Sequence, residues 1–507
     1  MEAGDWTWLW RQHNEHRIIF PELVFAADEL WFSGNQVLPL IASFTCYLAT
    51  VVLLGCTFWR GVKAPGQAKL RALLLGGVIA GWPLTAFVLG TPFLLQWTLL
   101  QCAVISGLLA ASSPRLPLLA ISIACGFVGT FSSANGVLLW PILLSVAACR
   151  GMPRGRLIAL AISAVAAVGL FLVGYHRPST PSLASLRHAG ACFGFVLSYL
   201  SMPFGVLRHP TFGITFGLLS LAVWLTCLIS TFRRRTRSVS RCEAVAFGYF
   251  FFLLLTAALT SLARVEVGDP GFSNAKAARY LTLPLLGWAS CVPLVYAVSL
   301  RHQWRVFAPR LVLIATVAVV AFMQIRLGRW LRTNDNYVSH QQWAAASLEN
   351  GVFDPASIGS VFPKQEFIEH YLPMLRSRHK SIFAGREFQF LRQEFRSIFP
   401  NVSNADGGIL RITHVQGGVS IVGWAANLEG RRGTAILLVN ERGKVVGVGR
   451  RLQAGIPREI PRPPVKQALI WVGYINSLYP SKSFTPFEIG TDDASALRLA
   501  PRTSIPP

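Results

Sequence analysis

The stretch Gln36-Val-Leu-Pro-Leu-Ile-Ala-Ser-Phe-Thr-Cys-Tyr-Leu-Ala-Thr-Val-Val-Leu-Leu-Gly-Cys-Thr-Phe58 contains no Asp, Glu, Lys or Arg. A helix needs about 20 apolar residues to cross a bilayer, so this stretch predicts a membrane span. Similar stretches continue to residue 327, and the expected spans are 36–58, 72–89, 93–111, 116–132, 134–149, 157–174, 211–231, 243–262, 280–299 and 311–327. The sequence therefore predicts an α-helical polytopic membrane protein of about ten spans, in which the short pair at 116–149 can be a hairpin that does not fully cross.

Composition supports this class. The chain has 507 residues, of which 52% are hydrophobic and 14% charged, whereas a soluble domain carries about 25% charged residues. The net charge is +24, which we attribute to the enrichment of Arg and Lys in cytoplasmic loops. Nucleic-acid binding is disfavoured because the basic residues are scattered over loops without interleaved aromatic residues.

The basic loops also predict the orientation. With ten spans, both termini lie outside and every Arg-rich loop is cytoplasmic; these loops carry Arg60, Lys63, Lys69 and Arg71, then Arg150, Arg154 and Arg156, then Arg233, Arg234, Arg235, Arg237 and Arg241, then Arg301, Arg305 and Arg310. Residues 190–206 are apolar enough to span, but a span there would move Arg233–Arg235 outside. We therefore expect 190–206 to be a re-entrant or interfacial helix on the outer side.

The remaining segments complete the expected domain organisation. Residues 1–35 are expected to be a polar loop on the outer face, and residues 328–403 a helical or irregular connector. Alternating apolar residues in Ile409-Leu-Arg-Ile-Thr413 and Val419-Ser-Ile-Val-Gly-Trp424, and a hairpin pattern over 435–448, predict a mainly β domain over 404–500. We expect a sandwich-like arrangement, with an antiparallel barrel as the alternative. Residues 501–507 are expected to be a disordered tail. All nine cysteines precede this region, which suits an extracytoplasmic domain on a bacterial inner membrane.

A polar cluster precedes the first span. It contains His13, Glu15, His16 and Arg17, directly followed by apolar residues that place it near the membrane surface. A carboxylate beside two imidazoles can act as a general base or hold a divalent cation. The alternative is a structural outer loop whose tryptophans form an interfacial belt. No HExxH pattern is present, so we expect no structural metal site.

Two further polar segments are expected on the same side. Residues 261–280 concentrate charge between two spans, and their Arg264 and Arg279 suit a pyrophosphate or an anionic headgroup. Asn135, followed by Gly136, forms a polar turn that can bond a sugar. The alternatives are ion pairs that hold the first loop together and a simple turn in the second. The loop beginning Tyr175-His-Arg-Pro is expected to be a solvated surface.

These motifs carry a resemblance. The order of His13-Asn-Glu-His-Arg17, Ser132-Ser-Ala-Asn-Gly-Val-Leu-Leu-Trp-Pro141, and Arg264-Val-Glu-Val-Gly268 with Ala278-Arg-Tyr280 resembles a group of uncharacterised bacterial polytopic membrane proteins. These look like distant relatives of the C-type membrane glycosyltransferases, which use lipid-phosphate-linked sugars. The resemblance covers roughly residues 5–325. In that superfamily a helix precedes the first outer loop, and a paired acidic motif is common; this chain lacks both. We therefore expect a first helix upstream of Met1.

The resemblance implies an inverting transfer of a sugar from a polyprenyl phosphate to an envelope glycan or lipid acceptor. It makes Glu15, or less strongly Asp5, the catalytic base. His13, His16, Arg17, Asn135, Arg264, Arg279 and Tyr280 are the implied substrate-binding residues. Two alternatives remain open: a transporter or flippase for a lipid-linked glycan, which predicts charged side chains at mid-membrane depth, and a non-catalytic envelope scaffold.

Overall fold

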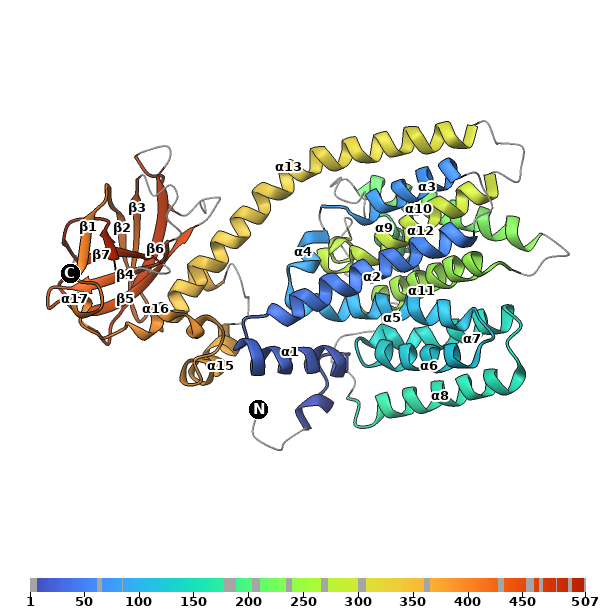
Figure 1. Ribbon diagram of the computed structural model, residues 1–507, viewed down its shortest axis with the longest axis horizontal. Helices are drawn as coiled ribbons and strands as arrows, with labels where there is room; N and C mark the ends of the chain where they lie inside the picture. The colour runs from blue at the N-terminus through green and yellow to red at the C-terminus, as the bar shows by residue number, and fades with distance from the viewer. Residues whose placement is uncertain are drawn as a thin grey trace. The chain divides into compact units, whose positions relative to one another are not determined.

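The computed structural model describes residues 7–61, 66–83, 85–176, 188–202, 210–233, 239–265, 272–299, 307–359, 365–426, 433–452, 460–464, 468–479, 481–490 and 495–505. Its contacts divide the chain into two compact units, which are Met1–Asp28 with Gln36–Leu327, and Glu29–Asn35 with Gly328–Pro507. The first unit is helical and the second contains all the strands that the structure describes (Figure 1).

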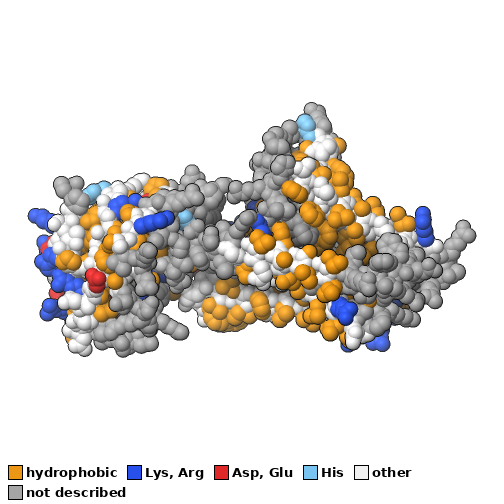
Figure 2. All heavy atoms as spheres, turned by 90° about the horizontal axis from the view of Figure 1, so that it is seen from above, with side chains coloured by type: hydrophobic (Ala, Val, Ile, Leu, Met, Phe, Trp, Pro, Cys, Tyr) orange, Lys and Arg blue, Asp and Glu red, His pale blue; other side chains and the backbone are white. Residues whose placement is uncertain are grey.

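Six helical segments of the described chain are long and apolar enough to cross a membrane. They are α2 (Val37–Gly61), η2 with α5 (Pro92–Leu94 and Leu95–Ala111), α8 (Arg154–Leu172), α10 (Pro210–Phe232), α11 (Arg241–Arg264), and η6 with α12 (Ala278–Tyr280 and Thr282–Ser299). Ile158, Ile162 and Val165 on α8 are 59%, 64% and 74% exposed. Such an exposed apolar face is typical of contact with lipid, and hydrophobic side chains cover much of the helical unit in Figure 2.

The other expected spans are shorter. The 116–149 pair consists of α6 (Leu116–Thr130), η3 (Ala134–Leu138) and α7 (Leu139–Cys149), each below spanning length. The expected span 72–89 is not one helix, because α3 (Gly66–Ala80) ends before Gly81 and Pro83, and α4 (Thr85–Leu89) follows. Helix α9 (Ala189–Leu200) has 12 residues and is also too short to span; residues 203–206 of the expected 190–206 helix lie outside the described part.

The N-terminal segment is more ordered than a loop. After η1 (Thr7–Trp10), residues Ile19–Phe32 form helix α1. The buried carboxylate of Asp28 accepts the backbone N–H groups of Gln36 and Leu38 at 2.7 and 2.8 Å. Asp28 thus satisfies N–H groups that the first turn of α2 leaves without partners, which fixes the chain direction into the first span.

The connector, which was expected to be helical or irregular, is mainly helical. Helix α13 runs from Phe307 to Glu349, so the expected span 311–327 continues as helix beyond residue 327. The connector ends with α14 (Pro355–Ile358), α15 (Gln365–Ser377), η8 (Ser381–Ala384), α16 (Arg386–Gln389) and α17 (Phe395–Ile398). One more short helix, η5 (Ser273–Lys276), precedes η6 in the helical unit.

The C-terminal domain is mainly β, as expected, and its strands form one sheet of half-barrel form. Of the two expected arrangements, a sandwich or a barrel, this is closer to the barrel. The strand order is β1-β8-β7-β4-β5-β6-β3-β2, with β9 paired to β7. The strands are β1 (Asn401–Asn404), β2 (Gly407–Val415), β3 (Gly418–Ala425), β4 (Gly433–Asn440), β5 (Val445–Leu452), β6 (Leu469–Asn476), β7 (Ser483–Gly490), β8 (Ser495–Arg498) and β9 (Thr503–Ser504).

Both faces of the sheet are buried at β4. Ile436 and Leu438 enter one core with Trp471, whereas Leu437 enters another with Phe395 of α17. The 435–448 hairpin is confirmed, since β4 and β5 pair antiparallel around a turn in which Gly443 has φ +78°. The tail is not disordered up to residue 505: Phe484 pairs with Thr503, so the last strand closes against β7.

Candidate functional site

The candidate site begins with a tight turn at His13–His16. The two histidines exchange backbone hydrogen bonds at 2.8 and 2.9 Å, and Asn14 between them has φ +51°. This left-handed conformation is costly for most residues but tolerated by Asn. The turn holds both imidazoles and Glu15 close together directly before α1.

Glu15 forms an ion pair with a residue that is distant in the sequence. Its Oε1 accepts a hydrogen bond from the Arg264 Nη2 at 2.8 Å, and the two side chains are 30% and 34% exposed. Arg264 is the last residue of α11, so the pair links segments 249 residues apart. The structure thus brings together Glu15, the expected catalytic base, and Arg264, which was expected to contact a phosphate.

The charge on Glu15 depends mainly on Arg264. Burial pushes the pKa of Glu15 up, but the charges of His16 and Arg264 and the Arg264 hydrogen bond outweigh it, so the pKa lies below its ordinary value. The His16 contribution requires a protonated imidazole, whereas burial lowers the pKa of His16 to about 4. At neutral pH, Arg264 is therefore the partner that keeps Glu15 ionised.

His16 anchors the turn to a second polar segment. Its Nδ1 accepts the backbone N–H of Ala134 at 3.0 Å, so this nitrogen carries no proton. The Nε2–H of the neutral ring then faces Glu15 Oε1 at 3.5 Å. His13 is exposed, and its ring centroid lies 5.2 Å from that of Phe93. Burial lowers the pKa of His13, which Glu15 partly offsets.

The neighbouring Asn135 turn is shaped by packing. Asn135 is only 6% exposed, and no hydrogen bond to its side chain is present among the described residues. Gly136 packs so closely on α6 that a Cβ would lie 1.8 Å from the Gly129 oxygen. A glycine is therefore required here, and the turn places Asn135 next to the His16 anchor rather than at a free surface.

Arg17 does not belong to the exposed site, contrary to expectation. It is 1% exposed, and its Nε donates to the Phe171 oxygen at 2.8 Å. Its two terminal nitrogens donate to the oxygens of Trp10 and Val173. The guanidinium therefore satisfies carbonyl groups at the C-terminal end of α8 and is unavailable to a substrate.

Tyr280 lies in the helical unit's interior, and Arg279 beside it is half-buried. Tyr280 is 4% exposed, and its ring centroid lies 5.4 Å from those of Trp97 and Tyr199. The Arg279 guanidinium carbon stacks over the Tyr280 ring at 4.9 Å. Tyr280 is thus a packing residue, and no direct bond joins either residue to Glu15 within the described chain.

The structure adds a contact at Gln12 and a half-buried carboxylate at Glu22. Gln12 exchanges hydrogen bonds with the backbone of His176, at 2.6 and 2.9 Å, so the loop expected to be solvated joins the cluster. Glu22 on α1 is half-buried with an Oε2 that has no partner in the described chain, and burial raises its pKa to about 7 despite Arg11. The sequence analysis missed Glu22, which an acidic residue inside the apolar stretch Phe20-Pro-Glu-Leu-Val24 could have revealed.

Three of the acidic residues near these motifs, Asp5, Glu266 and Asp269, lie outside the described residues. Among the described residues there is no group of three or more His, Cys, Asp or Glu side chains that could hold a metal ion. The divalent cation considered for the His13–Glu15–His16 turn therefore gains no ligand set from this part of the chain.

The stretch Val422-Gly-Trp-Ala-Ala426, at the end of β3, contributes to packing. Val422 is 1% exposed, and a Cβ on Gly423 would lie 2.2 Å from the Trp471 ring. The glycine leaves room for this buried indole across the β3–β6 pair, where Gly423 is opposite Trp471.

Comparisons of the chain with protein-family models, with curated proteins and with solved structures found no match. The site is therefore interpreted from its own geometry.

Proposed function

We propose that this chain is a glycosyltransferase-like integral membrane protein that transfers a sugar from a polyprenyl-phosphate donor to an envelope acceptor, on the outer face of a bacterial inner membrane. In this proposal the helical unit crosses the membrane about ten times, and the N-terminal segment and the β domain are extracytoplasmic. The observation that carries it is the 2.8 Å bond between the partly exposed Glu15 and Arg264.

The proposed mechanism uses this pair in sequence. The donor phosphate competes with Glu15 for Arg264, since a guanidinium binds phosphate and carboxylate with the same fork of donors. Losing its cation raises the pKa of Glu15 and makes it a stronger base. Glu15 then accepts the acceptor hydroxyl proton as that oxygen bonds to the anomeric carbon, and the lipid phosphate leaves with the electrons of the broken bond.

The neighbouring groups support these roles. The neutral His16 ring, fixed by Ala134, holds the turn in place and directs an N–H toward Glu15. His13 is the more exposed imidazole and is free to contact the sugar. Arg17 drops out of the proposed binding set because its nitrogens are bonded to backbone oxygens.

A lipid-linked glycan transporter is less well supported. Such proteins carry ionisable side chains at mid-membrane depth. In the six membrane-length segments of the described chain, every Asp, Glu, Lys and Arg lies in the first or last turn; these are Arg60, Arg154, Arg156, Arg241, Glu243, Arg264 and Arg279. The hypothesis of a non-catalytic scaffold gives no role to the Glu15 carboxylate and the Arg264 guanidinium, which are both about a third exposed.

The experiment is a mass-spectrometric profile of envelope glycans in a deletion strain complemented with wild type, Glu15→Gln or Glu29→Gln. Glu29 is the matched control, since it also lies on the N-terminal segment but contacts Arg378, at 3.9 Å. We expect wild type and Glu29→Gln to restore a missing sugar and Glu15→Gln to fail while the protein stays in the membrane. Restoration by Glu15→Gln would refute the role of Glu15.

A further inference from the structure

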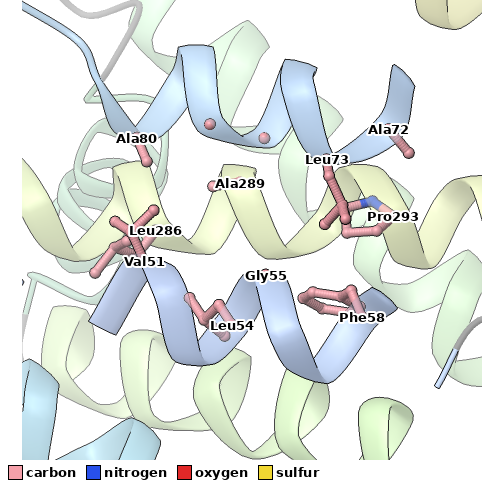
Figure 3. A pocket seen from close by; sticks show the side chains of 12 residues that line it. Val51, Leu54, Gly55, Phe58, Ala72, Leu73, Ala80, Leu286, Ala289 and Pro293 are labelled. Atoms are coloured by element: carbon pink, nitrogen blue, oxygen red, sulfur yellow. The ribbon is translucent and has the colours of Figure 1, made fainter. Parts of the chain in front are cut away.

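A recess lies between α2, α3 and α12, away from the Glu15 site. Its cavity volume is about 90 Å³, which is below the range of about 300–1,000 Å³ typical of sites for whole small molecules, so it has room for part of one narrow hydrocarbon chain. Figure 3 shows its wall, with Val51 and Leu286 at one end and Phe58 and Pro293 at the other. The residues that line it carry no polar side chain; they are Val51, Leu54, Gly55, Phe58, Ala72, Leu73, Gly76, Gly77, Ala80, Leu286, Ala289 and Pro293.

Glycines create the open space. A Cβ on Gly55 or on Gly77 would meet nothing within 4 Å, whereas a Cβ on Gly76 would lie 3.1 Å from the Ala289 oxygen. Gly76 therefore brings α3 close to α12, and Gly55 and Gly77 leave the volume beside that contact empty. An apolar recess on helices with lipid-facing surfaces fits a hydrocarbon chain better than a polar ligand.

One end of the recess is basic. Phe58 is followed in α2 by Trp59 and Arg60, and Ala72 is preceded in α3 by Arg71. Lys69 Nζ lies 5.7 Å from the centre of the Trp59 ring and donates to the Trp59 oxygen at 3.1 Å. Arg60 and Arg71 are exposed. Three cations beside an interfacial tryptophan match the phosphate level of a lipid.

We propose that this recess binds part of one acyl chain of an anionic phospholipid whose phosphate contacts Arg60, Lys69 and Arg71. The charge at the rim selects an anionic headgroup, and the apolar wall holds the chain. The site is independent of the proposed transfer reaction, because its basic end adjoins the end of α2 that lies farthest from Asp28 and the Glu15 turn.

The test is native mass spectrometry of the full chain in detergent with added phosphatidylglycerol or phosphatidylcholine of identical chains. Wild type should retain phosphatidylglycerol preferentially. Gly55→Leu and Gly77→Leu should reduce its retention at least about fivefold, because the new side chains fill the recess. Gly169→Leu on α8 is the matched control, since its Cβ also meets nothing within 4 Å. Arg71→Gln should lower the preference for phosphatidylglycerol about fivefold.

Three results would overturn the proposal. Wild-type retention by both Gly55→Leu and Gly77→Leu, with unchanged elution volumes, would place the lipid elsewhere. Equal retention of phosphatidylglycerol and phosphatidylcholine would remove the headgroup contact. Preferential retention of an added polyprenyl phosphate would assign the recess to the donor instead of a phospholipid.

Discussion

The two ends of the helical unit use charge in opposite ways. At one end, Glu15 and Arg264 bond each other through side chains that are a third exposed. At the other, Arg150 donates to the oxygens of Ser112 and Val239, and Arg241 donates to Ser112 Oγ and the Leu109 oxygen at 2.9 Å. Helix α11 runs from Arg241 to Arg264, so the ends lie about 36 Å apart.

This difference separates charged side chains that stabilise the fold from those that remain available to bind a ligand. Arg150, Arg115 and Arg60 all act on Arg241, so like charges gather at that end. Of these, Arg150 and Arg241 donate to backbone oxygens. Such arginines stabilise helix ends and set orientation. The Glu15 end instead holds a pair whose members can each exchange their partner for a ligand. Arg17 shows that position at the Glu15 end is not sufficient, because its donors are bonded to backbone oxygens.

The largest expected effect concerns Arg264. Arg264→Ala should reduce formation of the glycan product about 100-fold or more, as the loss of a cation at a developing phosphate charge does. Stability should change by only about 1 kcal/mol, because the Glu15 bond is partly exposed. Product measured by mass spectrometry and thermal unfolding in detergent check the two parts. A large loss of stability with normal product would make the pair structural and erase the contrast between the two ends.

Next in size is Arg150→Met. The bonds to Ser112 and Val239 join the α5 end to the segment before α11, and hydrogen bonds from charged donors contribute about 1.5–3 kcal/mol. We expect the free energy of unfolding to fall by about 2 kcal/mol with the product unchanged. Arg154→Met is the control, as Arg154 is an exposed basic residue close by in sequence. Equal effects of the two substitutions would contradict the structural role of Arg150.

Acidification should weaken the Glu15 end specifically. His16 has a pKa of 6.5 in the unfolded chain and about 4 when folded, so the unfolded state binds more protons in that window and stability falls as pH drops through it. The depressed pKa of Glu15 acts in the same direction at lower pH. We expect His16 to contribute a loss of about 2 kcal/mol between pH 7.5 and pH 5, which the opposite contribution of Glu22 offsets in part. Thermal unfolding of His16→Asn should show a smaller pH dependence than wild type, and an identical slope would argue against this assignment.

The smallest expected effect concerns Glu22 and has the opposite sign. Its pKa is 4.5 when unfolded and about 7 when folded, so the folded state binds more protons and stability falls as pH rises through that window. Glu22→Gln should therefore stabilise the protein at pH 8, by about 1 kcal/mol after solvent screening, and have little effect at pH 4. Unfolding midpoints at the two pH values check it, and destabilisation at pH 8 would show that the carboxylate has an ionic partner.

Much of the fold could be predicted from the sequence, because local pattern governs it. Apolar runs such as 36–58 and 243–262 became α2 and α11, since a chain in lipid must satisfy its backbone hydrogen bonds within the helix. The 435–448 hairpin followed from alternation around a glycine turn. Failures occurred where continuity depends on distant contacts, as in the 72–89 run and the helix over residues 19–32 that was expected to be a loop. Strand pairing also depends on distant contacts, so the sequence left a sandwich and a barrel open for the β domain.

For the candidate site, the sequence by itself determined which polar residues flank its apolar runs, and thereby selected Glu15, His16, Asn135 and Arg264. Only the tertiary structure decided how they are used. It paired Glu15 with Arg264 across 249 residues, fixed His16 on Ala134 across 118, and directed Arg17 to carbonyl oxygens. The reason is physical: hydropathy depends on each residue's own transfer free energy, whereas a hydrogen-bond partner depends on packing between helices that local sequence does not encode.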